Sequence, residues 1–114
     1  MNLTGNWSYS EDFGAGNSTG EVILKQVEDK LYADFSFVEE IDGDYRIEVQ
    51  EKLEGEIKNS EVLLKSMEVI ARNKNGIIKY LANSFEVHIV SENKLVGSSF
   101  DTDNVCGVFI MERI

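Results

Sequence analysis

Apolar and polar residues alternate along most of this chain, and no other feature limits its fold as strongly. The segment 45–57 shows the pattern most clearly, because charged or polar residues separate the apolar ones. Its apolar face consists of Tyr45, Ile47, Val49, Leu53 and Ile57. An α-helix would scatter these residues around its circumference, whereas an extended strand collects them on one side. The same alternation recurs at residues 31–37 and 85–89, so the chain is predicted to fold mainly as β-strands.

Turn-forming residues divide the chain into eight predicted strands. They span residues 3–10, 20–27, 31–38, 44–57, 61–72, 77–91, 94–100 and 105–113. Short connections make each strand antiparallel to the next, and long strands are disfavoured at the free edges of a sheet. We therefore expect an all-β fold in which residues 1–114 form a single eight-stranded antiparallel up-and-down (meander) β-barrel. Two alternatives stay open: an open meander packed on a second copy, and a bulge or helical turn at residues 82–84.

The formal net charge of −10 argues against nucleic acid and anionic membranes as partners, because such a field repels both. The acidity is concentrated in residues 1–57, which hold 14 acidic and 4 basic residues, against 7 and 7 in the remainder. No apolar run is long enough to cross a bilayer, no apolar leader follows Met1, and Cys106 is the only cysteine. These features predict a cytoplasmic protein without disulfides, in which Cys106 is a small buried side chain.

Trp7 and Arg113 are predicted to lie at the same end of the barrel, because its first and last strands must pair in opposite directions. There an arginine can lay its guanidinium group over the indole ring and close the barrel. With Gly5-x-Trp7 in the first strand, a meander across the whole chain and the late Arg113, the sequence resembles the calycin superfamily of lipocalins, fatty-acid-binding proteins and avidin-like barrels. The resemblance implies that Gly5, Trp7 and Arg113 close the barrel and that a small apolar ligand enters at the other end.

The inward faces of the predicted strands supply a candidate ligand site in the lumen. Its predicted lining is Tyr9, Phe35, Phe37, Tyr45, Val49, Glu51 and Phe85. Glu51 is unusual, because it falls on the apolar face of its strand, where burying a charge is costly. We interpret Glu51 as a polar ligand anchor, with two alternatives: a bulge that turns it outward, or a pair with an inward basic residue. Glu68 raises the same question in a strand that is apolar on both faces, a pattern that also predicts an extra buried face and a homodimer.

Acidic residues gather in the connections predicted at the end opposite Trp7. This acidic rim comprises Glu11, Asp12, Glu39, Glu40, Asp42, Asp44, Asp101 and Asp103. Solvated hairpin tips are the plainest interpretation, but such a rim also attracts cations and basic protein surfaces. None of its loops has the spacing of a calcium-binding loop, so no metal is predicted.

No arrangement of residues predicts catalysis or a cofactor. His88 alternates outward without a matched nucleophile, and no pair of carboxylates stands out among the 21 acidic residues. We therefore expect a non-enzymatic binding protein whose barrel holds a small, partly apolar ligand, for which a cation is one option. The alternative is a small acidic inhibitor or immunity-type protein that blocks a basic protein partner such as a toxin nuclease.

Overall fold

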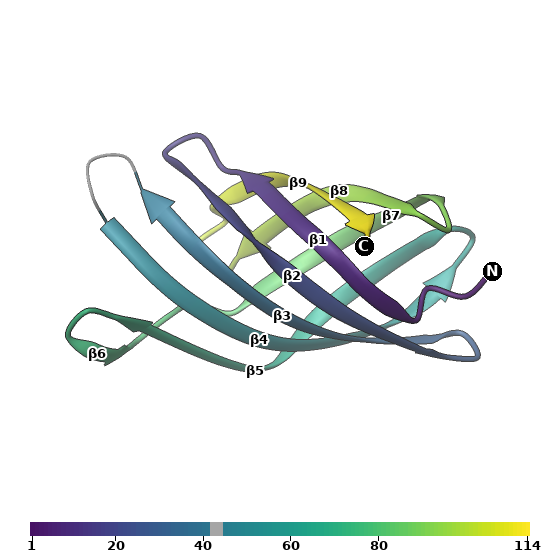
Figure 1. The fold of residues 1–114 in the computed structure, drawn as a ribbon, viewed down its shortest axis with the longest axis horizontal. Helices are drawn as coiled ribbons and strands as arrows, with labels where there is room; N and C mark the ends of the chain where they lie inside the picture. The colour runs from purple at the N-terminus through teal and green to yellow at the C-terminus, as the bar shows by residue number, and fades with distance from the viewer. Residues whose placement is uncertain (42–44) are drawn as a thin grey trace.

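The computed structural model describes residues 1–41 and 45–114, and all regular secondary structure in these ranges is β-strand (Figure 1). The strands are β1 (Gly5–Asp12), β2 (Gly16–Val27), β3 (Lys30–Ile41), β4 (Tyr45–Lys58), β5 (Glu61–Asn73), β6 (Gly76–Ile78), β7 (Asn83–Ser91), β8 (Lys94–Asp101) and β9 (Cys106–Arg113). Asp42 and Asp44 of the predicted acidic rim lie outside the described residues, and so does the side chain of Tyr45. The described ranges contain no helix that could span a membrane.

The strands close into a barrel. Their order is β4-β3-β2-β1-β9-β8-β7-β5, and β4 also pairs with β5, so eight strands form a ring. The short strand β6 extends the sheet beyond β5. β1 pairs antiparallel with β9 from Trp7↔Arg113 to Asp12↔Val108. The predicted fold class is thus confirmed, and the open meander is excluded because the first and last strands pair within one chain.

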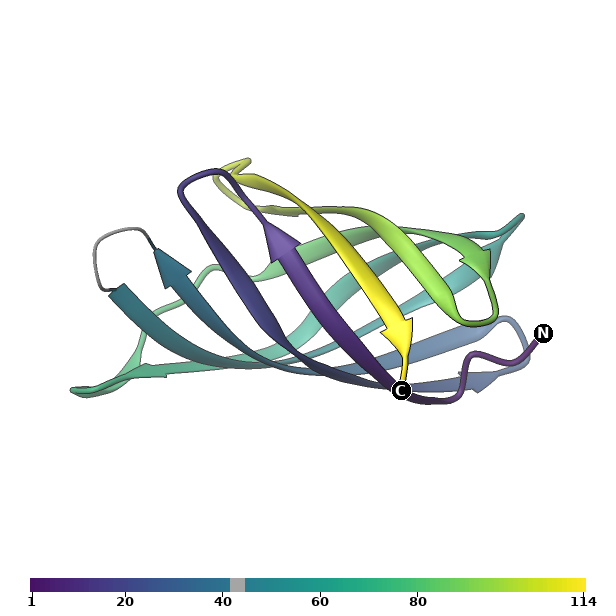
Figure 2. The same ribbon diagram turned by 45° about the horizontal axis from the view of Figure 1, so that its top comes forward.

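The two ends of the barrel differ in what they carry. The turns after β1, β5 and β8 lie at one end, which we call the open end (Figure 1). The turns after β2, β4 and β7 lie at the other, the closed end, together with the N-terminus. Figure 2 shows β1 and β9 side by side, completing the ring. Because strands alternate in direction, each inward side chain has a defined height between these two ends.

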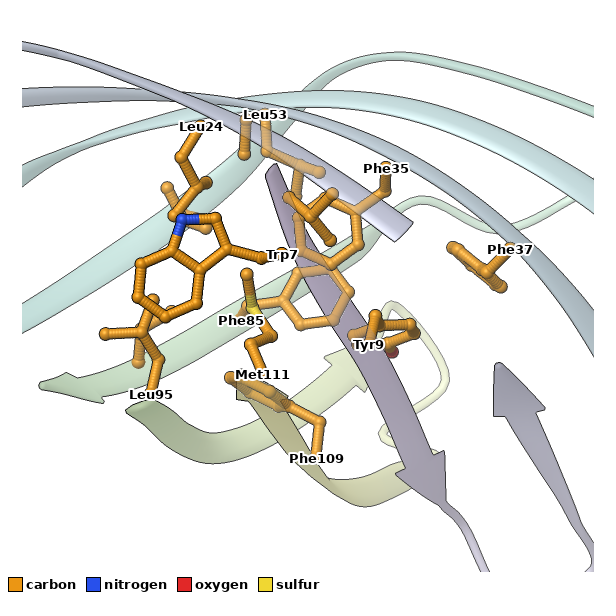
Figure 3. Packing of buried hydrophobic residues seen from close by; sticks show 14 of the residues in the cluster. Trp7, Tyr9, Leu24, Phe35, Phe37, Leu53, Phe85, Leu95, Phe109 and Met111 are labelled. Carbon is orange, nitrogen blue, oxygen red and sulfur yellow. The ribbon is translucent and has the colours of Figure 1, made fainter. Parts of the chain in front are cut away.

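The closed half of the barrel is filled by apolar side chains (Figure 3). Trp7 is fully buried, and the rings of Phe35 and Phe85 stack with their centroids 4.6 Å apart. Tyr9 packs edge-on against both rings, at centroid distances of 5.1 and 6.1 Å. Aromatic pairs in such geometries stabilise beyond their buried area. Space for a ligand must therefore lie nearer the open end.

Arg113 covers Trp7 at the closed end. Its guanidinium carbon lies 4.7 Å from the centre of the indole ring. The guanidinium donates hydrogen bonds of 2.7–3.0 Å to three backbone carbonyls, those of Asn2, Thr4 and Glu92. Gly5 has a φ of 145°, and a Cβ atom there would lie 2.9 Å from Arg113 Nη1. The glycine of Gly5-x-Trp7 therefore leaves room for the arginine, which explains why the two residues occur together.

The predicted strand at residues 77–91 is wrong in one respect, because it is divided. β6 pairs with the end of β5 and β7 with its beginning, while residues 79–82 between them belong to no strand. The division faces a β-bulge on β5: Lys52 of β4 pairs with Glu68, but the next residue, Leu53, pairs with Ser66. Met67 is the extra residue. A bulge bends its strand and increases the local twist, which disturbs pairing with the neighbouring strand.

The bulge also explains why the sequence of β5 is apolar on both faces. Val62 and Leu64 point inward before Met67, whereas Ala71 points inward after it, so the inward positions change from even to odd numbers. Glu68 is exposed as a result. Leu63, Met67 and Ile70 stay 41–63% exposed on the outer face, and the homodimer that they suggested stays a prediction.

Candidate functional site

Polar side chains occupy the inward positions near the open end, above the apolar core. The alternation that turns Tyr9 inward continues to Glu11, and the alternation through Phe35 and Phe37 continues to Glu39. Further polar residues of this belt are Ser18, Glu51, Ser66, Asn83 and Ser99. The lumen is therefore divided into an apolar floor and a polar mouth.

Glu51 is the most deeply buried acid of this belt, with 1% of its surface exposed. Its carboxylate accepts hydrogen bonds from the Asn83 backbone N and side-chain Nδ2, both at 3.0 Å, and from the Ser66 hydroxyl. Glu51 is not turned outward by a bulge, because it points inward. It is not paired with a basic residue either, because its partners are amide and hydroxyl groups. Its role as a ligand anchor stays a prediction.

Glu11 and Glu39 are half-buried, and each accepts a hydrogen bond from a tyrosine hydroxyl. Tyr9 donates to Glu11, which also accepts from Ser99. Tyr80 donates to Glu39 Oε1 at 2.7 Å from the segment 79–82. A Cβ atom on Gly107 would lie 2.6 Å from Glu11 Oε2, so this glycine gives the carboxylate its space.

Burial raises the pKa of the carboxyl groups of Glu11, Glu39 and Glu51 above the usual range, because desolvation disfavours their charged forms. The hydrogen bonds that they accept oppose this effect. Repulsion adds to it, since the charges of Glu39 and Glu51 raise the pKa of Glu11 further. No basic side chain among the described residues contributes to these three shifts. The mouth therefore favours a proton or another cation.

A pocket of about 330 Å³ opens at this end of the barrel, and we call it the mouth pocket. Its polar lining includes Glu11, Glu39, Asn83, Ser99 and Asp101. The exposed Lys79 also borders it, but among the described residues it forms no salt bridge with these acids. Its apolar lining includes Phe13, Ile41, Ile47, Ile78, Leu81 and Val105. Tyr80 also lines the pocket, and its hydroxyl donates to Glu39. Apolar walls with a few converging polar groups are typical of small-molecule sites.

A larger groove of about 990 Å³ crosses the outer wall of the barrel, but it has a different character. Exposed charges of both signs line it, among them Glu56, Lys58, Glu61, Lys65 and His88. Its acids have bases beside them, and His88 Nδ1 lies 3.8 Å from Glu61. Among its described residues, the groove therefore lacks the partly buried acids without a salt bridge that line the mouth pocket.

The aromatic residues that the sequence predicted as ligand contacts lie beneath the mouth pocket. Tyr9, Phe35, Phe37, Val49 and Phe85 all point inward and are at most 5% exposed. They pack against one another, and the pocket is lined by other side chains. Sequence reasoning missed most of these, although the alternation through Glu39 continues to Ile41 and could have identified it. No local signal indicated Tyr80.

The predicted acidic rim divides into two groups. Glu11, Glu39 and Asp101 line the mouth pocket, and Asp101 also accepts hydrogen bonds from the backbone of its own turn, at Asp103 N and Val105 N. Asp12, Glu40 and Asp103 are exposed on the outside. Inward and outward acids alternate along β1 and β3, as strand geometry requires.

Cys106 is exposed, contrary to the prediction that it is buried. The reason is its place on β9, where Gly107, Phe109 and Met111 take the inward positions. Cys106 nevertheless borders the mouth pocket. Within residues 1–41 and 45–114, no three His, Cys, Asp or Glu side chains are grouped closely enough to hold a metal ion.

Comparisons with known proteins give likenesses of fold. No protein-family model and no curated protein matches the chain. It is similar to a redesigned β-barrel, mFAP1, bound to DFHBI, with a TM-score of 0.68 and 10% identity over 98% of this chain and 94% of that one. A second redesigned barrel, mFAP0, also bound to DFHBI, has a TM-score of 0.68 and 11% identity over 97% of this chain and 98% of that one. A de novo designed fluorescence-activating barrel has a TM-score of 0.65 and 10% identity over 97% of this chain and 93% of that one.

Proposed function

We propose that this chain is a non-catalytic, calycin-like binding barrel that holds a small, partly apolar organic cation in the mouth pocket. The observation that carries the proposal is the meeting of apolar walls with partly buried carboxylates that have no salt bridge among the described residues, although Lys79 stands at the pocket edge. The volume of about 330 Å³ is sufficient for a small molecule. That barrels of similar fold bind the small molecule DFHBI supports this use of the architecture.

Each part of the pocket has a role in this proposal. Glu11 and Glu39 would pair with an ammonium or amidinium group, since both line the pocket and neither forms a salt bridge among the described residues. Glu51 lies outside the pocket lining, so its role as an anchor would be indirect: it holds Asn83 in the pocket wall and adds negative potential. Ile47 and Leu81 would contact the apolar part of the ligand. Charge pairs that are partly desolvated are stronger than exposed pairs, so the pocket would favour an amine over an alcohol of the same shape.

Native mass spectrometry of the protein taken gently from the cytosol of its own cells tests the proposal. We expect an adduct of roughly a few hundred daltons, as suits a pocket of this size. Glu39→Gln should remove it, whereas Glu40→Gln, which neutralises the exposed neighbour of Glu39, should retain it. An adduct insensitive to Glu39→Gln, or the absence of any adduct, would contradict the proposal. The same spectra report whether the chain forms the homodimer suggested by the outer face of β5.

Calorimetry with defined probes gives a second test. 2-Phenylethylamine and 2-phenylethanol have the same apolar group and differ in charge at neutral pH. We expect the amine to bind more tightly by roughly tenfold or more, because it alone can pair with the carboxylates. Equal affinities would show that charge does not select the ligand.

A second candidate is an acidic inhibitor of a basic protein. The exposed acids Asp12, Glu40 and Asp103 and the net charge of −10 support it. Such a complex should contain a basic protein in fixed stoichiometry and weaken as salt rises. Glu40→Lys should then slow association more than Glu39→Gln, because Glu40 faces outward. For either function we propose a cytoplasmic location, where a reducing environment keeps the exposed Cys106 thiol free.

A further inference from the structure

Residues 79–82 interrupt what is otherwise one continuous hairpin. β5 pairs with β6 up to Ala71↔Ile78 and with β7 from Lys65↔Ser84 onward. Five residues on each strand, 66–70 and 79–83, lie between these two zipped parts, so the register is the same on both sides of the gap. Figure 1 shows the chain leaving β6 as a coil before it enters β7. We call residues 79–82 the arch.

The hairpin stays open because both of its strands change phase within the gap. On β5 the bulge at Met67 moves the inward positions from Leu64 to Ala71. On the facing chain the inward position moves from Ile78 to Phe85, again from one parity to the other. A regular ladder needs continuous alternation on both strands, so it cannot form across this gap without turning side chains to the wrong face.

Side-chain hydrogen bonds, and not a backbone ladder, attach the arch to the barrel. Tyr80 donates from the arch to Glu39 on β3 at 2.7 Å. At its end, the Asn83 backbone N donates to Glu51 Oε2 at 3.0 Å, and the Asn83 amide donates to Glu51 Oε1 at the same distance. In the described part of the chain, no backbone hydrogen bond between elements involves residues 79–82. The arch therefore depends on two carboxylates, which act as its latch.

We propose that the arch is a movable wall of the mouth pocket, a gate latched by Glu39 and Glu51. Ile78, Tyr80, Leu81 and Asn83 all line the pocket, so displacement of the arch would change its width. Segments with few backbone hydrogen bonds open at the lowest free-energy cost in a protein. As a gate for a ligand it rests on the proposed function. A cation that pairs with Glu39 competes with Tyr80 for the same carboxylate, so binding and unlatching are coupled in both directions.

Amide hydrogen exchange on the ligand-free full chain tests the latch. Tyr80→Phe removes only the hydroxyl that reaches Glu39, and Tyr32→Phe is the matched control, because Tyr32 is 38% exposed on the outer face of β3. The readout is the backbone amide of Asn83, which donates to Glu51 at the end of the arch. We expect Tyr80→Phe to speed its exchange roughly tenfold, the value of one charge-assisted hydrogen bond. The turn at residues 102–105 should not change, and neither should any amide in Tyr32→Phe.

Unchanged exchange of the Asn83 amide in Tyr80→Phe would overturn the proposal, and so would equal acceleration throughout the barrel, which would mean general loss of stability. Glu39→Leu removes the acceptor from the other side, whereas the amide oxygen of Gln would still accept from Tyr80, so Glu39→Leu should give the same local acceleration. If the Asn83 amide of Glu39→Leu exchanges at the wild-type rate, the latch is wrong. The outcome is independent of the ligand: amine binding with a rigid arch overturns only the gate, and a loose arch without amine binding overturns only the function.

Discussion

Arg113→Met is the substitution whose effect follows most directly from the structure. The arginine lies over the fully buried ring of Trp7, and its guanidinium donates four hydrogen bonds to the carbonyls of Asn2, Thr4 and Glu92. Methionine has a similar apolar stem but no donor and no charge. The variant therefore removes the contacts between the last strand, the N-terminal segment and the β7–β8 turn while it retains much of the packing.

The magnitude can be worked out from these contacts. The four hydrogen bonds lie near solvent, where water can replace the guanidinium, so each contributes at the lower end of the usual range and together they give about 2 kcal/mol. The cation–π contact adds about 1 kcal/mol. The expected loss in the free energy of unfolding is about 3 kcal/mol, or a fall in Tm of roughly 12 °C for a chain of this size.

Urea unfolding followed by tryptophan fluorescence measures this loss at the affected site, because Trp7 is the only tryptophan. Arg72→Met is the matched control, since Arg72 is exposed on β5, and it should change stability by no more than about 0.5 kcal/mol. Arg113→Lys should lose roughly half as much as Arg113→Met, because an ammonium group cannot reach three carbonyls and stack as well. If Arg113→Met and Arg72→Met had equal effects, our account of the closed end would be refuted.

Three further predictions concern the open end. Burial raises the pKa of Glu11, Glu39 and Glu51, so the folded chain holds more protons than the unfolded chain. The free energy of unfolding should therefore fall as pH rises from about 4.5 through the raised pKa values. A urea midpoint that rises between about pH 5 and pH 8 would contradict this sign. Gly107→Ala places a Cβ atom 2.6 Å from Glu11 Oε2 and should cost roughly 1–3 kcal/mol in a denaturation assay; Glu11→Ala in the same chain should recover part of the loss, and no recovery would locate the clash elsewhere. Labelling the exposed Cys106 with a bulky maleimide should block amine binding in calorimetry, because Cys106 borders the mouth pocket; unchanged affinity would move the ligand away from this wall.

The closed end could be predicted from sequence because it follows from topology. Once eight strands form a closed antiparallel ring, Trp7 near the start of the first and Arg113 near the end of the last must meet. The open end was harder, because the rule that charges avoid interiors competes with strand alternation. Alternation turns Glu39 inward after Phe35 and Phe37, but its charge assigned it to a solvated rim. The hydroxyl that makes this position tolerable belongs to Tyr80, 41 residues away.

The arch could be predicted only in part. The phase change in β5 is visible in the sequence, since apolar residues stand at 62 and 64 and then at 69 and 71. That the facing chain changes phase at the same height depends on the pairing of two strands, which local patterns do not specify. The role of Glu51 depends on this pairing too, because its main partner, Asn83, begins the strand after the gap.

Three buried or half-buried carboxylates without a salt bridge among the described residues are a cost to the fold, and this cost separates a structural from a functional origin. If the acids were there for stability, neutral replacements would weaken the barrel. If they are there for a cation, removing a desolvated charge that no salt bridge among the described residues offsets should stabilise the empty barrel and abolish binding, as is common at functional sites. Glu11 is the clearest residue for this comparison, because it takes no part in the latch of the arch and Asp12 beside it is exposed. A barrel that gains stability and loses its ligand in Glu11→Gln, and does neither in Asp12→Asn, would locate the function inside the mouth pocket and not on its outer rim.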